Sequence, residues 1–324
     1  GGDGAAGTWV VESATTVNGS RRLNAKDFGA IGDGVTDDTA ALQAFFDALT
    51  GSMGQDVSFR YGFIPAGIYY TTDVLYLRGN NTNSTGFVLE GESFSSQAIG
   101  GTIIEYHGVS TDLGALTCVG VSGSCIRRIN VNANTIAKFA GLATLMTGVD
   151  TSSENVLVEE CMFYGPRNVE EGAAWGHGNI TSEWAGGSDV AYWTFRDCKF
   201  YGSANLWNDP GYEPSSFAFR NSNNVLCTQF LKCFFNLAKV GMNNGIAANM
   251  VHMEWCDFNL IRTWAIIDNG WANCYRECYC EGSGGILAGT IGDVTLERCR
   301  FNVNSVAKTY PGALAADDGY QISH

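Results

Sequence analysis

Residues 155–163 read NVLVEECMF and begin a degenerate repeat that continues to about residue 303. The repeat is anchored on Cys-x-Phe, with a second cysteine replacing the phenylalanine in one copy. The anchors are Cys161/Phe163, Cys198/Phe200, Cys233/Phe235, Cys256/Phe258, Cys278/Cys280 and Cys299/Phe301. Successive anchor cysteines are 37, 35, 23, 22 and 21 residues apart, so three of the five gaps indicate one period.

The residues before each anchor alternate as they do in a β-strand. The third residue before the cysteine is apolar in nearly every copy: Val158, Phe195, Phe230, Met253, Tyr275 and Leu296. The second residue before it is mostly charged, with signs that alternate over much of the series, which favours a surface ladder of ion pairs: Glu159, Arg196, Leu231, Glu254, Arg276 and Glu297. The residue directly before the cysteine breaks the alternation, as a sharp bend would. Coils of strand, bend and strand predict a solenoid that buries its apolar faces by stacking.

The eleven cysteines could form disulfides, bind a metal or act as small hydrophobic residues. Six of them occupy the repeat anchor, where stacked coils would place them one above another inside the solenoid. The odd total and the lack of Cys-x-x-Cys pairs disfavour a zinc site. We therefore expect a mostly reduced internal ladder, with no bound metal and no cofactor.

Length and charge limit the possible classes of function. The chain has 324 residues, is 45% hydrophobic and can bury a large core, and its repeat argues for one elongated domain. The net charge of −14 disfavours nucleic acid as a partner, because phosphate backbones require clustered lysine and arginine. The same charge would repel a polyanionic sugar unless a cation intervened. No apolar run approaches the roughly 18 residues of a membrane span.

The flanks of the repeat divide the chain into three parts. Residues 1–22 are rich in Gly and polar residues, and we interpret them as an arm or linker. From residue 37 to about residue 49 an apolar face recurs at helical spacing, with Thr36 as the expected N-cap and Asp37 and Asp38 at the positive end of the helix dipole. This short N-terminal α-helix would cap the solenoid. The β-helix domain then covers residues 23–303, and residues 304–324 form a C-terminal extension.

The string DFGAIGDGVTDDTAALQAFFDAL at residues 27–49 closely resembles the opening motif of the pectate-lyase-superfamily domains of phage tailspikes, polygalacturonase-like enzymes and related glucanases. FIPAGIYY at 63–70, FVLEG at 87–91 and GTIIEY at 101–106 resemble that family too. The resemblance covers roughly residues 23–303 and implies an all-β fold, a single right-handed parallel β-helix. The shared motif is structural, so we interpret Asp33, Asp37 and Asp38 as turn and cap residues rather than catalysts.

The two oversized gaps place long segments at residues 164–184 and 201–214, in adjacent coils. Loops grafted on a rigid scaffold are where function concentrates, and both segments mix aromatic residues with carboxylates, as a glycan cleft requires. Carboxylates beside aromatic residues are the acid/base candidates: Glu183, Asp209 and Glu213. The candidates for substrate binding are Trp175, His177, Trp184, Trp207 and Tyr212. Alternatively, the aromatic residues pin the loops to the solenoid wall, and His177 is an ordinary surface residue.

Stacked parallel strands are ~4.8 Å apart, so the scaffold can hold two carboxylates at either glycosidase spacing. Elimination at a uronate would instead need a basic residue and a cation to neutralise the sugar carboxylate. The long segments supply Arg167 and His177 but no lysine, and Arg196 and Lys199 lie nearby. Hydrolysis is therefore slightly preferred over elimination.

These observations predict a tailspike-like protein, on a virion or extracellular, that binds a bacterial surface polysaccharide and depolymerises it. The alternatives are a secreted bacterial polysaccharide lyase or hydrolase, and a non-catalytic glycan-binding or virion structural protein. The resemblance also implies a homotrimer, with residues 1–22 as the segment that would attach to a virion.

Overall fold

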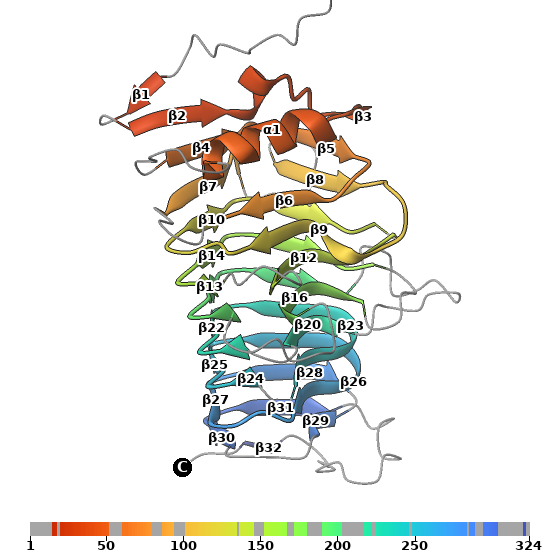
Figure 1. Ribbon diagram of the computed structural model, residues 1–324. Helices are drawn as coiled ribbons and strands as arrows, with labels where there is room; N and C mark the ends of the chain where they lie inside the picture. Colours follow the sequence, from red (N-terminus) through yellow and green to blue (C-terminus); the bar gives the residue numbers. More distant parts are fainter. Residues whose placement is uncertain are drawn as a thin grey trace, which may run out of the picture.

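In a computed structural model the chain is a single right-handed parallel β-helix, whose coils stack along one axis from α1 at one end to β30 and β32 at the other (Figure 1). The predicted fold class is confirmed. The residues that the structure describes are 15–17, 20–51, 60–79, 86–93, 101–134, 136–145, 152–166, 172–179, 190–202, 217–221, 225–245, 248–283, 285–288, 294–303 and 320–321.

Sheet A runs the length of the solenoid and contains the strand that precedes each anchor cysteine. Its strands are parallel except for the β1–β2 hairpin. In spatial order they are β1 (Thr15–Val17), β2 (Ser20–Asn24), β4 (Arg60–Ile64), β7 (Phe87–Gly91), β10 (Cys125–Arg127), β14 (Leu157–Glu159), β18 (Thr194–Arg196), β22 (Gln229–Leu231), β25 (His252–Glu254), β27 (Asn273–Arg276) and β30 (Val294–Glu297).

Sheet B follows the bend and forms two rows, which the long strands β23 and β26 join by running through both. Row 1 contains β3 (Asp33–Asp37), β5 (Gly67–Thr71), β8 (Thr102–Tyr106), β11 (Asn130–Asn132), β15 (Met162–Tyr164), β19 (Lys199–Tyr201), β23 (Phe234–Asn244), β26 (Asp257–Asp268), β28 (Tyr279–Ser283) and β31 (Arg300–Val303), with β32 (Tyr320–Gln321) antiparallel to β31. Row 2 adds β6 (Leu75–Arg78), β9 (Thr111–Val119), β12 (Ala137–Leu145), β16 (Ala173–Asn179), β20 (Phe217–Asn221) and β29 (Gly285–Ala288).

A short sheet C closes the coils between row 2 and sheet A. Its strands are β13 (Ser153–Glu154), β17 (Val190–Ala191), β21 (Val225–Leu226) and β24 (Ala248–Asn249). The helical elements of the described chain are a 3-10 helix, η1 (Ala25–Phe28), and an α-helix, α1 (Thr39–Thr50).

The anchor residues form the core, as the repeat predicted. All six anchor cysteines have free thiols and at most 1% exposure. The Cys198 thiol donates to the carbonyl of Val158 one coil earlier at 3.4 Å. Burial raises the pKa of the anchor thiols of Cys161 and Cys233, and that of Cys118, a buried cysteine outside the repeat, to about 12. The phenylalanines two residues on form a continuous stack with ring centroids 4.8–5.6 Å apart: Phe163, Phe200, Phe235 and Phe258.

The predicted bend is confirmed by the backbone. The residue before each anchor cysteine has φ between 49° and 56°, in the left-handed region that glycine and asparagine adopt most readily: Glu160, Asp197, Lys232, Trp255, Glu277 and Arg298. A single left-handed residue turns the chain sharply, so the side chain of the following cysteine enters the core next to that of the preceding strand.

The outward residues of sheet A form the predicted ladder of ion pairs over part of its length. Glu159 is paired with Arg196 on one side and with Arg127, at 3.8 Å, on the other. Arg276 and Glu297 are 2.8 Å apart at the far end. Exposed pairs of this kind contribute about 0–1 kcal/mol each to the free energy of unfolding, so the ladder adds little to stability.

The predicted helix at 37–49 is present as α1, and its apolar face is buried as expected: Leu42, Phe45, Phe46 and Leu49. Its role as a cap stays a prediction.

The expectation that Thr36 is the N-cap is wrong. Its hydroxyl instead donates to Asp33 at 2.9 Å within a turn. The N-cap position is Asp38, whose carboxylate instead accepts from the backbone amides of Ile31 and Gly32 at 2.6 and 2.9 Å. The neighbouring Asp37 carboxylate bonds the first amide of the helix, that of Thr39, at 3.0 Å. All three aspartates serve turns and caps, as interpreted.

Candidate functional site

The outer face of row 1 carries a column of aromatic and polar side chains, one from each coil. We call it the outer column, and register places its members side by side on successive strands: Tyr70, Glu105, Asn132, Tyr164, Tyr201, Asn236, Asn259 and Glu281. All are half-buried except Glu281, which is exposed. Because successive strands lie ~4.8 Å apart, the eight positions extend about 34 Å along the axis.

Two aromatic stacks interrupt the polar residues of this column. The rings of Tyr164 and Tyr201 are parallel within 12°, with centroids 5.1 Å apart. Tyr70 stacks on His107 at 4.4 Å, and that imidazole also lies 3.4 Å from Glu105 and 3.2 Å from Asn134. Flat apolar rings between amides and carboxylates match the apolar faces and hydroxyl edges of a sugar chain.

A carboxylate pair lies at the end of the outer column. Asp257 pairs in register with Tyr279, and Glu281 pairs with Asn259, so the two acids are diagonal neighbours on β26 and β28. Two residues along a strand (~6.6 Å) and one strand spacing (~4.8 Å) give a diagonal of about 8 Å, which falls within the roughly 6.5–9.5 Å of inverting glycosidases. Burial, and secondarily the charge of Glu281, raises the pKa of Asp257. A carboxyl group with a raised pKa beside an exposed carboxylate can act as a general acid and base.

This pair was not predicted from the sequence, because the candidates were taken from the residues before the anchor cysteine and from the two long segments. Asp257 is the middle residue of the copy Cys256-Asp257-Phe258, a position that points outward between two core residues. The signal was present in the repeat, since the alternation that turns the cysteine and the phenylalanine inward turns the residue between them outward.

Trp175 and His177, predicted as substrate-binding residues, lie on the inner side of row 2. Trp175 is fully buried and His177 is 1% exposed. The imidazole is surrounded by rings at centroid distances of 5.1–6.0 Å: Trp175, Trp193, Phe195 and Phe219. The surface position expected of His177 is therefore wrong, and Trp175 lies in the core rather than on a sugar-binding surface, because strand β16 continues through this segment and turns both side chains inward. Neither can contact a glycan from there.

His177 begins a polar column inside the solenoid. In the next coils the same inner position holds Asn221, Asn244 and Asp268. Asn221 donates to Asn244 at 2.7 Å, and Asp268 accepts from the hydroxyl of Tyr275 at 2.5 Å. Burial lowers the pKa of His177 to about 3, so the ring is neutral at physiological pH.

The remaining predicted site residues lie outside the described residues: Glu183, Trp184, Trp207, Asp209, Tyr212 and Glu213. Their two segments connect different described strands. Residues 203–216 lie between the end of β19, just after Tyr201 of the outer column, and the start of β20. Residues 180–189 instead follow the opposite end of row 2, after Asn179, and lead to sheet C.

Two further observations concern the described residues alone. They contain no group of three or more His, Cys, Asp or Glu side chains arranged to hold a metal ion. A search of the same residues found no helix that is long and apolar enough to cross a membrane.

Comparisons with solved structures are consistent with this architecture. The Dettilon tailspike protein aligns with 85% of this chain and 46% of its own, at a TM-score of 0.55 and 10% identity. The N-terminal fragment of bacteriophage phi29 gene product 12 aligns with 90% of this chain and 45% of its own, at a TM-score of 0.53 and 12% identity. At these identities the likeness shows the fold.

Sequence comparison identifies more direct relatives. Mannuronan C5-epimerase AlgE4 of Azotobacter vinelandii is 31% identical over 157 residues, which are 44% of this chain and 27% of that protein. AlgE1 of the same organism is 30% identical over 158 residues, 44% of this chain and 10% of that protein. The chain thus spans less than a third of these curated relatives. The model of the family "rhamnogalacturonase A/epimerase, pectate lyase-like" matches residues 22–276. Since that match covers most of the chain, the chain belongs to this family.

Proposed function

We propose that this protein binds a bacterial surface polysaccharide along the outer column of sheet B and hydrolyses it as a phage tailspike. The observation that carries the proposal is the column itself, an array about 34 Å long of stacked tyrosines, amides and carboxylates on a rigid sheet. A repetitive polymer is suited to such a repetitive surface, because successive sugar units meet similar groups.

The relatives support a polymeric sugar as the partner. The matched family is described as pectate lyase-like, and the named relatives act on mannuronan. The Dettilon protein is a tailspike, which supports a place on a virion or outside the cell. A homotrimer, and attachment through residues 1–22, belong to the same proposal.

In this mechanism Asp257 donates a proton to the leaving glycosidic oxygen, and Glu281 activates water on the opposite face of the sugar. The raised pKa of Asp257 favours its role as the acid, because it keeps the proton at a higher pH than an ordinary aspartate does. Glu183, Asp209 and Glu213 are alternative acid/base residues, and Trp184, Trp207 and Tyr212 are further sugar contacts.

The test is a digestion screen against purified capsule and lipopolysaccharide, with analysis of the products. Hydrolysis yields new reducing ends without ultraviolet absorbance, whereas elimination yields unsaturated, absorbing products. We expect Asp257→Asn and Glu281→Gln each to lower the rate at least a hundredfold. Glu297→Gln, an outward carboxylate of sheet A, is the matched control and should retain full activity.

Other outcomes distinguish the alternatives. If the two variants cleave normally while Glu183→Ala, Asp209→Ala or Glu213→Ala do not, the site lies on the long segments instead. Binding of the polysaccharide without any product would indicate a non-catalytic glycan-binding protein. A detergent-resistant trimer that needs residues 1–22 to join a particle would support the tailspike, and a monomer would contradict it.

A further inference from the structure

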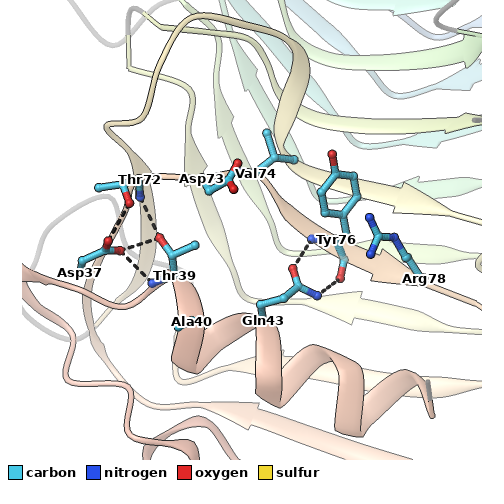
Figure 2. A pocket seen from close by; sticks show the side chains of 9 residues that line it. All are labelled: Asp37, Thr39, Ala40, Gln43, Thr72, Asp73, Val74, Tyr76 and Arg78. Atoms are coloured by element: carbon cyan, nitrogen blue, oxygen red, sulfur yellow. Dashed lines mark hydrogen bonds between the residues drawn. The ribbon is translucent and has the colours of Figure 1, made fainter. Parts of the chain in front are cut away.

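A groove of about 500 Å³ lies between the start of α1 and strand β6 (Figure 2). These elements are at the end of the solenoid away from β26 and β28, which carry Asp257 and Glu281 (Figure 1). We call the groove the α1/β6 groove. It is lined by the first turns of α1, by the β5–β6 turn and by β6: Asp37, Thr39, Ala40, Gln43, Thr72, Asp73, Val74, Tyr76 and Arg78. Because Thr72 and Asp73 follow Tyr70 closely in the chain, this groove adjoins the first residue of the outer column.

Hydrogen bonds between the elements that line the groove hold them in place. The Gln43 side chain bonds both backbone groups of Tyr76, accepting from the amide at 2.8 Å and donating to the carbonyl at 3.0 Å. Asp37 accepts from the hydroxyls of Thr39 and Thr72 at 2.5 and 2.6 Å. These bonds fix the first turns of α1 to β6 and to the turn before it, so little ordering of the walls is needed when a ligand binds.

Two charged groups of the groove are left for a ligand. The Arg78 guanidinium lies 4.0 Å above the ring of Tyr76, and neither Arg78 nor Asp73 forms an ion pair with another described residue. Asp73 accepts one bond, from the amide of Val74 at 2.7 Å, which leaves its other oxygen available. An exposed arginine, a carboxylate and an aromatic ring thus meet in one hollow.

We propose that the α1/β6 groove binds one neutral sugar residue of the polysaccharide, as an anchoring subsite remote from the carboxylate pair. Hydroxyl groups of a pyranose both donate and accept, which matches Asp73 and Arg78, while its apolar face packs on the Tyr76 side chain where the core and the guanidinium leave it open. Two carboxylates against one guanidinium, in a chain of net charge −14, favour a neutral over an acidic sugar. This inference rests on the proposed binding of a polysaccharide.

The geometry has a kinetic consequence. The outer column extends about 34 Å from Tyr70, beside the groove, to Glu281 in the carboxylate pair. Only a long chain can occupy both places at once, and the gain from linking two sites is lost when a ligand cannot reach both. The groove should therefore increase the affinity for polymer and leave the cleavage of a short oligosaccharide unchanged, because a short ligand in the groove does not reach the carboxylate pair.

The test uses Arg78→Gln and Asp73→Asn, singly and combined, in the full chain. With the polysaccharide cleaved in the screen, we expect the combined variant to raise KM about tenfold at unchanged kcat. A tetrasaccharide of the same polymer should show wild-type KM and kcat. Arg298→Gln, an exposed arginine at the bend after β30, is the matched control. Equal effects on both substrate lengths, or no effect on the polymer, would overturn the inference.

A binding measurement separates this inference from the proposed hydrolysis. The probe is an immobilised array of neutral and uronate-containing bacterial oligosaccharides, presented to wild type, Asp257→Asn and the combined groove variant. Neutral sugars should be retained by wild type and Asp257→Asn and about tenfold less by the groove variant. This result would hold even if no polymer is cleaved. Retention of uronate-containing sugars alone, or retention that the groove variant leaves intact, would contradict a neutral-sugar subsite.

Discussion

The inner and outer sides of row 1 come from the same strands yet differ in almost every property. Inside, Phe163, Phe200 and Phe235 are stacked and fully or almost fully buried. Outside, one residue further along, Tyr164 and Tyr201 stack with similar spacing but stay half-buried. Stacking of coils therefore produces an aromatic ladder on both sides, and exposure to water distinguishes the outer ladder from the core.

The largest expected effect tests this contrast directly. Phe200→Ala removes a ring packed between Phe163 and Phe235 and should lower the free energy of unfolding by about 3–5 kcal/mol. Tyr201→Ala, the matched change on the outer side, should cost about 1 kcal/mol or less. Urea titrations of both variants would measure the difference. Equal losses would mean that the outer column is a second core rather than a surface.

The inner side also predicts a response to acid. Buried His177 has a pKa lowered to about 3, whereas the imidazole of an unfolded chain titrates near 6.5. Between these values the unfolded state binds more protons, so His177 favours folding fully above pH ~6.5 and loses this contribution as the pH falls. The loss reaches on the order of 3–5 kcal/mol near pH 3.

His177→Phe should reduce this acid sensitivity, because a phenylalanine suits the surrounding rings and cannot bind a proton. Urea midpoints at pH 7, 5 and 4 would report the slope. The half-exposed His252 provides the control, since His252→Phe should keep the acid sensitivity of the wild type. If His177→Phe and wild type lose stability in parallel, the histidine is not the buried group that senses acid.

The smallest effect is expected at the bend, where the inner and outer sides of a coil meet. Lys232 has φ of 54°, a conformation that disfavours any residue with a Cβ atom. Lys232→Gly should therefore be neutral or raise the free energy of unfolding by about 0.5 kcal/mol. Leu231→Gly, one residue earlier in β22, should lower it by about 1 kcal/mol. If both changes lower the free energy of unfolding, the Lys232 side chain contributes more to stability than its left-handed backbone costs.

Much of the fold was predictable because it depends on local patterns. The three-residue offset between Val158 and Cys161 predicted two inward side chains on either side of a bend, and the left-handed Glu160 confirms it. Helical spacing predicted the apolar face of α1. Its first turn was harder to predict, because three candidate caps, Thr36, Asp37 and Asp38, compete, and bonds to distant backbone groups decide among them.

The candidate site was less predictable. The two long segments were predicted to carry the site because they interrupt a regular repeat. Strand β16 runs through the first of them and places Trp175 and His177 in the core. Asp257 and Glu281 were overlooked because they are 24 residues apart and only the stacking of β26 on β28 makes them neighbours.

Residue order alone determines which side chains of a coil point inward, since alternation along a strand and a left-handed bend are properties of a few consecutive residues. It therefore establishes the solenoid, the cysteine ladder and the family motif. Tertiary structure decides which residues of different coils become neighbours, because the register depends on the full length of every coil between them. The outer column, the carboxylate pair and the α1/β6 groove all belong to this second class.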